Sequence, residues 1–388
     1  MHVLWQDDTI ADEASRTVAG TISTHTVLFI RIQRQQSVFP GWTNLLLRGD
    51  HTLKAVILRE IGGPEKLLYE NLPDPVPGPD EVVVKLNAAA LNRRDAYARQ
   101  GLYPGVRLPA IPGSDGSGTI ETVGSDVKDL TVGQAVVINP ALNWGPNPRF
   151  YGPQFNILGI PTDGTYAQFV KVPAANVYIK PPYLTWDEAA ALPLAGLTAY
   201  RALFTRGTLQ TGETVIIPGI GGGVATTLLQ MAVAVNARVF VTSSSEEKLA
   251  RAEKLGAAGG VNYRDPQWVK KLRSLAGGAD LSIDSIGGSV FNDLITLANP
   301  GSRIVGFGAT AGPVNNLVMP RLFFKQLDVR GSTMGSPIDF EEMLAFCTTH
   351  QIRPIIDRHF PLEDAGAAQT AMEEGIQFGK IVLDIPKS

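Results

Sequence analysis

A glycine-rich turn between a short apolar run and an amphipathic segment restricts the fold of this chain more than any other feature. Residues 215–217 are apolar without interruption, as in a strand that is buried on both faces. They lead into the glycines of residues 218–223, after which apolar side chains recur at helical spacing from 224 to 235. Asn236 tolerates the left-handed conformation that ends a helix, and residues 238–242 follow as a second strand.

This order of strand, glycine turn, helix and strand, within about thirty residues, is the nucleotide-binding βαβ pattern. Glycines let the backbone approach a ligand closely, so that a pyrophosphate can rest on free N–H groups at the positive end of the helix. The pattern predicts dinucleotide contacts from four residues of the turn: Gly219, Gly222, Gly223 and Val224. A turn with a purely structural role is the alternative.

The residues after the second strand favour NADP(H) over NAD(H). An NAD site usually has an acidic residue there, which bonds the ribose 2′-hydroxyl. This chain instead has Ser243, Ser244 and Lys248. Hydroxyl and ammonium groups suit a 2′-phosphate, whereas a carboxylate at residue 243 would repel one. The serines can also cap the next helix, since Ser244 and Glu247 have capping-box spacing, and the two roles are compatible.

The composition excludes several classes of partner. With 388 residues the chain is long enough for two domains with separate cores. Its formal net charge is −3, which argues against nucleic acid and acidic membranes as partners. The longest apolar stretches fall short of the roughly 20 residues that span a bilayer. The single cysteine, Cys347, rules out an intramolecular disulfide, and the expected compartment is cytoplasmic.

The first 53 residues differ from the rest of the chain. Acidic residues near the start, such as Asp7 and Asp8, argue against a transit peptide, and the apolar run at 27–30 is too short for a signal-peptide core. Globular patterning starts at Lys54. We therefore expect residues 1–53 to be a poorly ordered leader, or to precede the true start of translation at Leu53. The intact mass of the natively expressed protein distinguishes these hypotheses.

Two kinds of pattern beyond the leader predict an α/β protein with two domains. Residues 54–180 combine short β-type runs with frequent Pro and Gly, which indicates a small, mainly β domain. From about residue 184, strands and helices alternate with short connections, which predicts a doubly wound parallel sheet. The further elements expected there are helices at 246–255, 266–276 (with Asp265 as N-cap and Gly277 beyond the end) and 288–298, and strands at 260–263, 281–283 and 302–307. The tail from about residue 331 is expected to pack back on the first domain.

Several segments outside the glycine turn match one known family in order. Residues 91–104 contain an Asn-x-x-Asp motif, and residues 111–118 resemble the Gly-His-Glu segment of zinc alcohol dehydrogenases. Residues 190–200 are similar to a helix that enters a cofactor domain, and residues 284–288 and 306–308 to strand ends that border a cofactor. From Lys54 to the C-terminus, the chain thus resembles the medium-chain dehydrogenase/reductase superfamily, and more closely its zinc-free quinone oxidoreductase-like branch.

The resemblance implies a Rossmann dinucleotide-binding domain at residues 181–330 and a GroES-like catalytic domain formed by residues 54–180 and 331–388. It also implies further cofactor contacts: Thr198 near the nicotinamide, Lys248 and Tyr263 at the 2′-phosphate, Gly306 and Phe307 beside the cofactor, and Lys380 as an additional candidate. Relatives form homodimers by pairing edge strands of the cofactor domain, and residues 314–319 are the candidate edge here.

Departures from the zinc-dependent members predict that this chain holds no zinc. Those relatives use Cys, His and Cys or Asp as ligands. The matching positions here are Asn92 and Ser114, and the third would fall near Leu158. None of these is a credible zinc ligand. The five histidines show no ligand spacing either.

The absence of a metal favours reduction of an activated acceptor over oxidation of simple alcohols. We expect hydride transfer from NADPH to a quinone or an α,β-unsaturated carbonyl, with hydrogen bonds stabilising the charge that develops on oxygen. Asn92 is expected to bond the substrate carbonyl, Tyr97 to donate a proton or bond the acceptor oxygen, and Asp95 to organise Arg99 or Tyr97. The structural alternatives are core packing for Tyr97 and an i,i+4 ion pair between Asp95 and Arg99.

Two other functions fit the same residues. One is an NADPH-binding protein with little turnover and a structural or regulatory role, a type that the superfamily contains. The other is an alcohol dehydrogenase that recruits a metal. NADPH oxidation with a panel of quinones and enones tests the first, and metal analysis of the purified protein tests the second.

Overall fold

The computed structural model describes residues 52–387, which lie within one compact unit that spans residues 50–388. The predicted leader falls almost entirely outside the described residues. Its last two residues, Thr52 and Leu53, belong to strand β1 (Thr52–Leu58), and Leu53 is only 2% exposed. Strand β1 pairs with β2 (Leu67–Pro73), with Thr52 opposite Pro73. Regular structure therefore includes two residues that the sequence pattern assigned to the leader.

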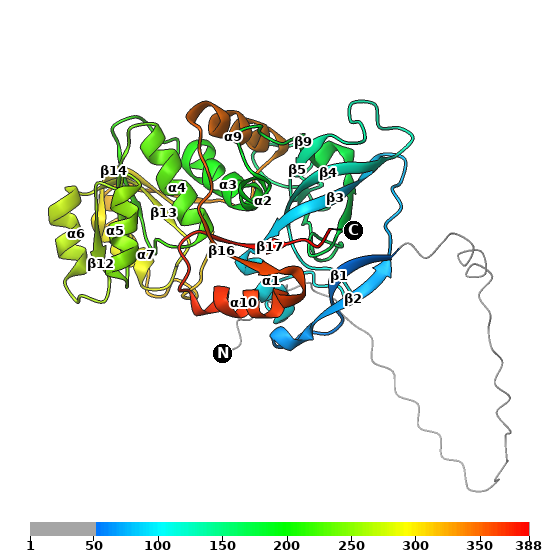
Figure 1. Ribbon diagram of the computed structural model, residues 1–388. Coiled ribbons are helices and arrows are strands. Elements are labelled where there is room, and N and C mark those ends of the chain that lie inside the picture. Colours follow the sequence, from blue (N-terminus) through cyan, green and yellow to red (C-terminus); the bar gives the residue numbers. More distant parts are fainter. Residues whose placement is uncertain (1–51, 388) are drawn as a thin grey trace, which may run out of the picture. The chain divides into compact units, whose positions relative to one another are not determined.

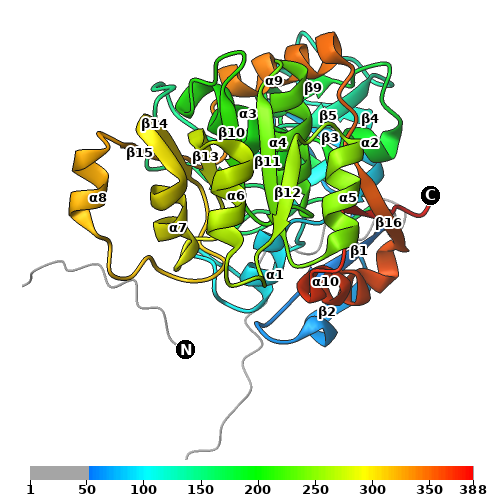
Figure 2. The same ribbon diagram turned by 90° about the vertical axis from the view of Figure 1, so that its left-hand side faces the viewer.

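One half of the fold is built on a six-stranded sheet in which all neighbouring strands are parallel (Figure 2). The strand order reverses next to β10, where β13 adds on the opposite side from β11, as in a doubly wound sheet. In spatial order the strands are β12 (Gly259–Asn262), β11 (Arg238–Ser243), β10 (Thr214–Ile217), β13 (Ala279–Asp284), β14 (Ala298–Gly306) and β15 (Asp328–Gly331). The predicted Rossmann topology is confirmed.

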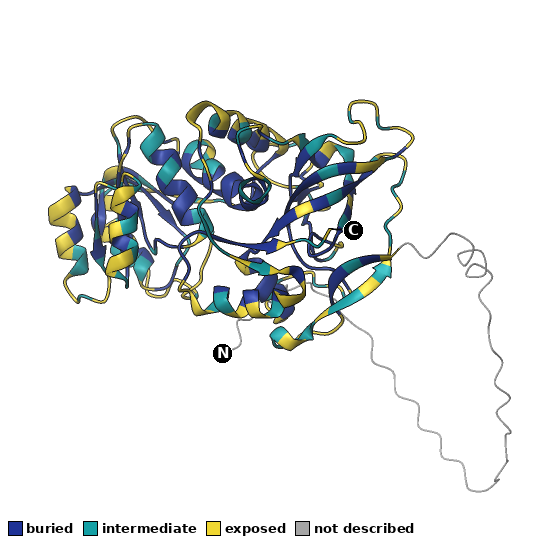
Figure 3. Ribbon diagram, viewed as in Figure 1, coloured by how far each residue is buried: buried dark blue, intermediate teal, exposed yellow. Residues whose placement is uncertain are grey.

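The central strand β10 is largely apolar because its alternate side chains enter two different cores. In β10, Val215 and Ile217 pack in one core and Ile216 packs in the other. The helices cover both faces of the sheet, and their outer sides are exposed (Figure 3). The helices of this half are α3 (Pro193–Tyr200), α4 (Gly223–Ala234), α5 (Glu246–Lys254), α6 (Trp268–Ala276), α7 (Val290–Leu297) and α8 (Met319–Phe324).

The helix ends follow the predicted capping signals only in part. Asn236 takes the predicted left-handed conformation, with φ of 61°. The N-cap of α5 is Ser245 rather than Ser244, because the Ser245 hydroxyl accepts a hydrogen bond from the Lys248 N–H. Helix α6 begins at Trp268, later than predicted, because the Asp265 carboxylate closes a short turn with the Gln267 N–H instead. Strand β14 begins at residue 298 rather than 302.

The other half is a seven-stranded, mostly antiparallel sheet (Figure 1). Its order is β16 (Ile356–Pro361), β17 (Lys380–Asp384), β3 (Glu81–Ala90), β4 (Asp115–Val123), β5 (Ala135–Ile138) and β9 (Val177–Ile179), with β8 (Phe169–Pro173) also paired to β3. The C-terminal strand β17 pairs with β3, so the tail returns to the first domain as predicted. Helix α9 (Pro337–His350) packs on α3 instead. The exact division into domains stays an interpretation.

Three further helices lie against the seven-stranded half. Helix α2 (Trp186–Ala191) packs on β3, β4 and β17, and α10 (Ala365–Glu374) packs on β17 and on α1 (Arg93–Arg99). The short strands β6 (Ala141–Leu142) and β7 (Asn156–Ile157) pair with each other. Within residues 52–387, no helix combines the length and the apolar character needed to cross a membrane.

Candidate active site

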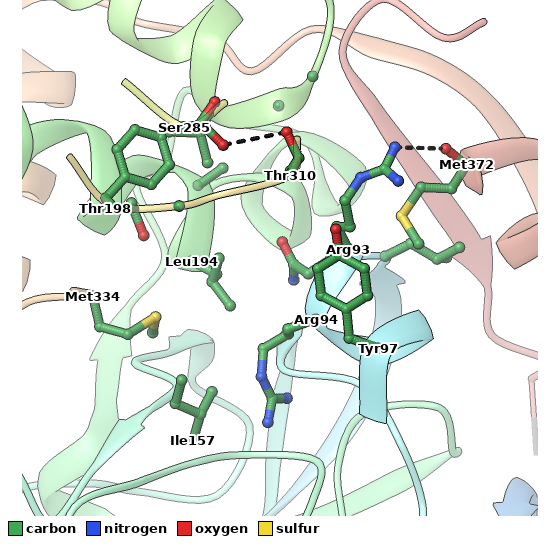
Figure 4. A pocket seen from close by; sticks show the side chains of 18 of the residues that line it. Arg93, Arg94, Tyr97, Ile157, Leu194, Thr198, Ser285, Thr310, Met334 and Met372 are labelled. Atoms are coloured by element: carbon green, nitrogen blue, oxygen red, sulfur yellow. Dashed lines mark hydrogen bonds between the residues drawn. The ribbon is translucent and has the colours of Figure 1, made fainter. Parts of the chain in front are cut away.

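A cavity of about 1420 Å³ lies between the carboxyl ends of the six-stranded sheet and helix α1. Gly219 follows β10, Ser285 follows β13 and Phe307 follows β14, so three neighbouring strands each deliver a residue to its wall. Figure 4 shows Thr198 and Ser285 on one side and Tyr97 on the other. Because β10 and β13 flank the point where the strand order reverses, this is where such sheets bind their ligands.

The glycine turn opens a space for a ligand at the start of α4. Gly219 and Gly221 have φ of 71° and 142°, conformations that residues with a Cβ rarely adopt. Gly222 is the N-cap of α4 and makes no side-chain cap, and a Cβ on it would meet no atom within 4 Å. The Gly379 N–H donates to the Gly221 carbonyl (2.8 Å) and holds the turn in place. Free backbone N–H groups at the positive end of this helix therefore face the cavity, as an anion site requires.

Gly223 is needed for a different reason, which is close contact with a lysine side chain. A Cβ on Gly223 would lie 2.4 Å from Cδ of Lys380, whose ammonium group is fixed by two hydrogen bonds. We predict that Gly223→Ala lowers the free energy of unfolding by about 1–3 kcal/mol through overpacking. Helix propensity alone would make Gly223→Ala stabilising, so a loss of stability would indicate the steric conflict with Lys380. Chemical denaturation without coenzyme measures the effect. Gly306→Ala is the control, since its Cβ would meet no atom within 4 Å.

The residues predicted for the 2′-phosphate meet at one end of the cavity. Ser243, Ser244, Lys248 and Tyr263 all line it. Lys248 Nζ donates to the Gly375 carbonyl (2.7 Å), and burial lowers the pKa of this ammonium group. Ser243 is 4% exposed, and its Oγ accepts a hydrogen bond from the Ser245 N–H. The structure thus brings together two hydroxyls, a phenol and a cation.

Most residues predicted for the nicotinamide end also border the cavity. Thr198 and Phe307 line it, as do Val224 and the glycines 219, 222 and 223. Gly306 is the last residue of β14 and is not among the lining residues. The next residue, Phe307, lines the cavity instead. Phe307 was predicted together with Gly306, and contact of Gly306 with the coenzyme stays a prediction.

Asn92 belongs to a buried polar network at the opposite wall. Its Oδ1 accepts from Lys380 Nζ (2.7 Å), and its Nδ2 donates to Asp115 Oδ2 (2.9 Å). Lys380 Nζ also contacts Asp115 Oδ2 (2.8 Å), and Asp115 Oδ1 accepts the Leu194 N–H (2.8 Å). Asp115 is fully buried and Lys380 is 5% exposed. The network fixes Asn92 and ties α3, β4 and β17 together at the cavity.

The predicted partners of Asp95 are wrong. Within residues 52–387 Asp95 makes no hydrogen bond to Tyr97, and Arg99 bonds Glu373 and Gln369 on α10 instead of Asp95. The i,i+4 ion pair does not form because the two side chains have other partners: Arg99 bonds α10, and Asp95 bonds Tyr166. Asp95 Oδ2 accepts the Asn92 N–H (2.9 Å) and the Tyr166 hydroxyl (3.1 Å). Asp95 does not line the cavity, and burial raises the pKa of its carboxyl group.

Tyr97 is half-buried and lines the cavity, which places it where the sequence prediction requires (Figure 4). Within residues 52–387 its hydroxyl makes no hydrogen bond to protein. The phenol is therefore available to a ligand in the cavity. Its catalytic role stays a prediction.

Comparison with known proteins fits this geometry. Residues 78–182 match the alcohol dehydrogenase GroES-like domain family, and residues 223–349 match the zinc-binding dehydrogenase family. A zinc-type alcohol dehydrogenase-like protein of Leptosphaeria maculans is 38% identical over 80% of this chain and 92% of its own length. A quinone oxidoreductase of Pseudomonas aeruginosa is 30% identical over 85% and 99%.

A solved structure described as an NAD-dependent alcohol dehydrogenase superposes with a TM-score of 0.82, at 39% identity, over 86% of this chain and all of that one. The chain belongs to the medium-chain dehydrogenase/reductase superfamily. It is an oxidoreductase of that superfamily, whose fold binds a nicotinamide cofactor and whose members act on small molecules.

Zinc, which the name of one matched family implies, does not fit the residues of this medium-chain dehydrogenase/reductase. At the positions that match zinc ligands, the Asn92 side chain is held by Lys380 and Asp115, and the Ser114 hydroxyl is held by Arg94 and the Leu158 carbonyl. Both side chains are neutral and are weak metal ligands, and each contacts a buried cation, Lys380 or Arg94, that would repel a metal ion. Among the described residues, Asp187, His359 and Asp384 could share a metal, but none of them lines the cavity.

Several residues of the cavity wall were given no role from the sequence, Arg94 and Leu194 among them. Arg94 and Leu194 line the cavity, although Arg94 was visible only as the second of two arginines before Asp95. Arg93 and Arg94 both line the cavity, and no local pattern shows which part of it each of them faces. Figure 4 shows that Arg93 points toward Met372 whereas Arg94 points toward Ile157.

Proposed function

We propose that this protein is a zinc-independent, NADPH-dependent reductase that transfers a hydride to a quinone or an α,β-unsaturated carbonyl. One observation carries the proposal. The same cavity has a hydroxyl- and ammonium-lined end suited to a phosphate, and a polar end whose metal-ligand positions hold Asn92 and Ser114. The coenzyme supplies the hydride when bound. The quinone oxidoreductase relative supports the acceptor class.

The coenzyme assignment depends on this chain's own residues. The N–H groups at the start of α4 are suited to the pyrophosphate, and Ser243, Ser244, Lys248 and Tyr263 to the 2′-phosphate. Residue 243 is a serine where an NAD site usually has a carboxylate. This argument favours NADPH, although one similar solved structure is described as NAD-dependent.

The acceptor end is suited to stabilise charge on a substrate oxygen. Tyr97 offers a free hydroxyl, and the second hydrogen of Asn92 Nδ2 has no recorded protein partner within residues 52–387. Asp95 holds the backbone of Asn92 and so positions it, without reaching the cavity itself. Tyr97 is the proposed proton donor.

Steady-state kinetics tests the proposal. The protein, treated with a chelator, is assayed for NADPH oxidation at 340 nm with a quinone panel, an enone panel and simple aldehydes. We expect turnover with quinones or enones that is insensitive to the chelator, and little with aldehydes. Binding of NADPH without turnover would favour the binding-protein alternative. Activity restored only by zinc would favour an alcohol dehydrogenase, the alternative suggested by the names of two similar proteins.

The protein is further proposed to form a homodimer through the β15 edge of the six-stranded sheet. The segment predicted as this edge, residues 314–319, is not a strand: residues 314–318 form an irregular connection, and α8 begins at Met319. The edge is β15, and the exposed apolar side chains nearby include Leu317, Phe323, Phe324 and Val329.

We predict that Phe324→Glu halves the mass measured by light scattering after size exclusion, because a buried charge at the interface is costly. Phe324 is 79% exposed in the single chain. Val132→Glu, at an exposed apolar side chain in a turn of the other half of the fold, is the control and should leave the mass unchanged. A monomeric wild-type protein would contradict the dimer.

A further inference from the structure

Arg94 is a buried cation that borders the cavity. The residue is 8% exposed, and its guanidinium group lies 4.7 Å from the centre of the Tyr103 ring. Arg94 Nη1 donates to Ser114 Oγ (2.7 Å) and the Leu158 carbonyl (3.1 Å), and Nη2 donates to the Ile160 carbonyl (3.0 Å). Four of these neighbours are neutral, so the guanidinium keeps much of its positive field.

The charge of Arg94 is only partly balanced. Its nearest carboxylate, Asp95 Oδ1, is 3.5 Å away, at the limit of a hydrogen bond, and Asp95 Oδ2 already serves Asn92 and Tyr166. Asp115 is paired with Lys380. The buried Arg94 Nε has no hydrogen-bond partner, and Nη2 has one recorded acceptor for two hydrogens. Because Arg94 lines the cavity, a negative charge that develops there would balance a buried cation whose other contacts are mostly neutral.

Arg94 also stands beside a position that matches a metal ligand in the zinc-dependent relatives. Ser114, which its Nη1 contacts, matches the ligand that is a histidine in those proteins. Asn92, two residues earlier, matches another, and both Asn92 and Arg94 line the cavity. A fixed organic cation is therefore found where the metal-dependent proteins place an inorganic one.

We propose that the Arg94 guanidinium stabilises the negative charge that develops on the acceptor oxygen, and so replaces the electrostatic role of zinc. The inference depends on the proposed function. When an enone accepts a hydride at its β-carbon, the C=C electron pair shifts and the carbonyl oxygen becomes an enolate oxygen. The coenzyme is the hydride source and is oxidised to NADP⁺. The α-carbon then takes a proton from Tyr97 or solvent, which restores the carbonyl group. A nearby cation lowers the energy of the charged oxygen.

The ionisation of a bound phenol tests this inference without turnover. The probe is 4-nitrophenol, whose anion absorbs visible light, added to the protein saturated with NADP⁺. In wild type we expect the bound probe to ionise about one pH unit or more below the free probe, because a cation within about 4–6 Å favours the phenolate. Arg94→Met should abolish this shift and reduce kcat by about 10²–10³-fold. Arg94→Lys, which keeps the charge, should retain part of both.

The controls separate electrostatics from folding. Arg107→Gln removes an exposed arginine that borders the same cavity and should leave the bound probe's ionisation unchanged. Circular dichroism and thermal unfolding establish that the Arg94 variants are folded. The inference is overturned if wild type leaves the probe's ionisation unperturbed, if folded Arg94→Met keeps the shift, or if the purified protein holds stoichiometric zinc in the cavity. Failure of the proposed function is recognised separately, as absence of turnover by wild type with quinones and enones.

Discussion

Replacing Ser243 with aspartate and Lys248 with alanine is expected to reverse the coenzyme preference from NADPH to NADH. Both residues line the same end of the cavity, and Lys248 is partly buried there. Loss of a charge-assisted hydrogen bond costs about 1.5–3 kcal/mol, which is roughly a ten- to hundredfold loss of NADPH affinity. The new carboxylate adds repulsion toward the 2′-phosphate and can bond a ribose 2′-hydroxyl. Coenzyme fluorescence titrations give both dissociation constants.

A matched control for this switch lies on the same helix. Lys254 is exposed at the end of α5 and does not line the cavity, so Lys254→Ala should leave the ratio of affinities unchanged. If the double variant at 243 and 248 retains the wild-type ratio, the 2′-phosphate lies elsewhere or is not recognised.

The second large effect is expected on stability, from the buried ion pair. Asp115→Ala leaves the Lys380 ammonium group buried with no carboxylate, and removes the acceptor for Asn92 and the Leu194 N–H. Removal of one partner of such a pair costs about 3–5 kcal/mol. We expect a loss of this size in the free energy of unfolding, measured in urea without coenzyme.

The double variant Asp115→Leu with Lys380→Met shows whether the loss comes from an unpaired charge. It removes both ions and should recover a large part of the stability, since apolar replacements of buried pairs are often neutral. Asp328→Ala, which breaks an exposed pair with Arg330, should change stability far less. A double variant as unstable as Asp115→Ala would mean that the hydrogen bonds of the network, and not its charges, stabilise this wall.

The Rossmann half could be predicted from the sequence because its signals are local. The apolar run at 215–217, the glycine turn and Asn236 each have one favourable conformation, and the structure confirms all three. Boundaries were less certain where two local options compete. At Ser244 and Ser245, either hydroxyl can cap α5, and the sequence does not decide between them. Residues 314–319 were predicted as an edge strand, but they form an irregular connection that leads into α8 at Met319.

The wall of the cavity around Asn92 could be predicted only in outline because its contacts are distant in sequence. Arg99 reaches Gln369 and Glu373, and Asn92 reaches Lys380. No pattern in residues 91–104 contains these partners. The local i,i+4 spacing therefore predicts Asp95 as the ion-pair partner of Arg99. The cofactor end was easier to predict, because its residues follow directly after strands of one parallel sheet.

Calorimetric titration of the full-length, chelator-treated protein with NADPH and with NADH tests the central claim most directly. The proposed function predicts one NADPH per chain, bound at least about tenfold more tightly than NADH because of contacts to the 2′-phosphate. Absence of heat with both coenzymes, or tighter binding of NADH, would contradict the proposed function of this cavity.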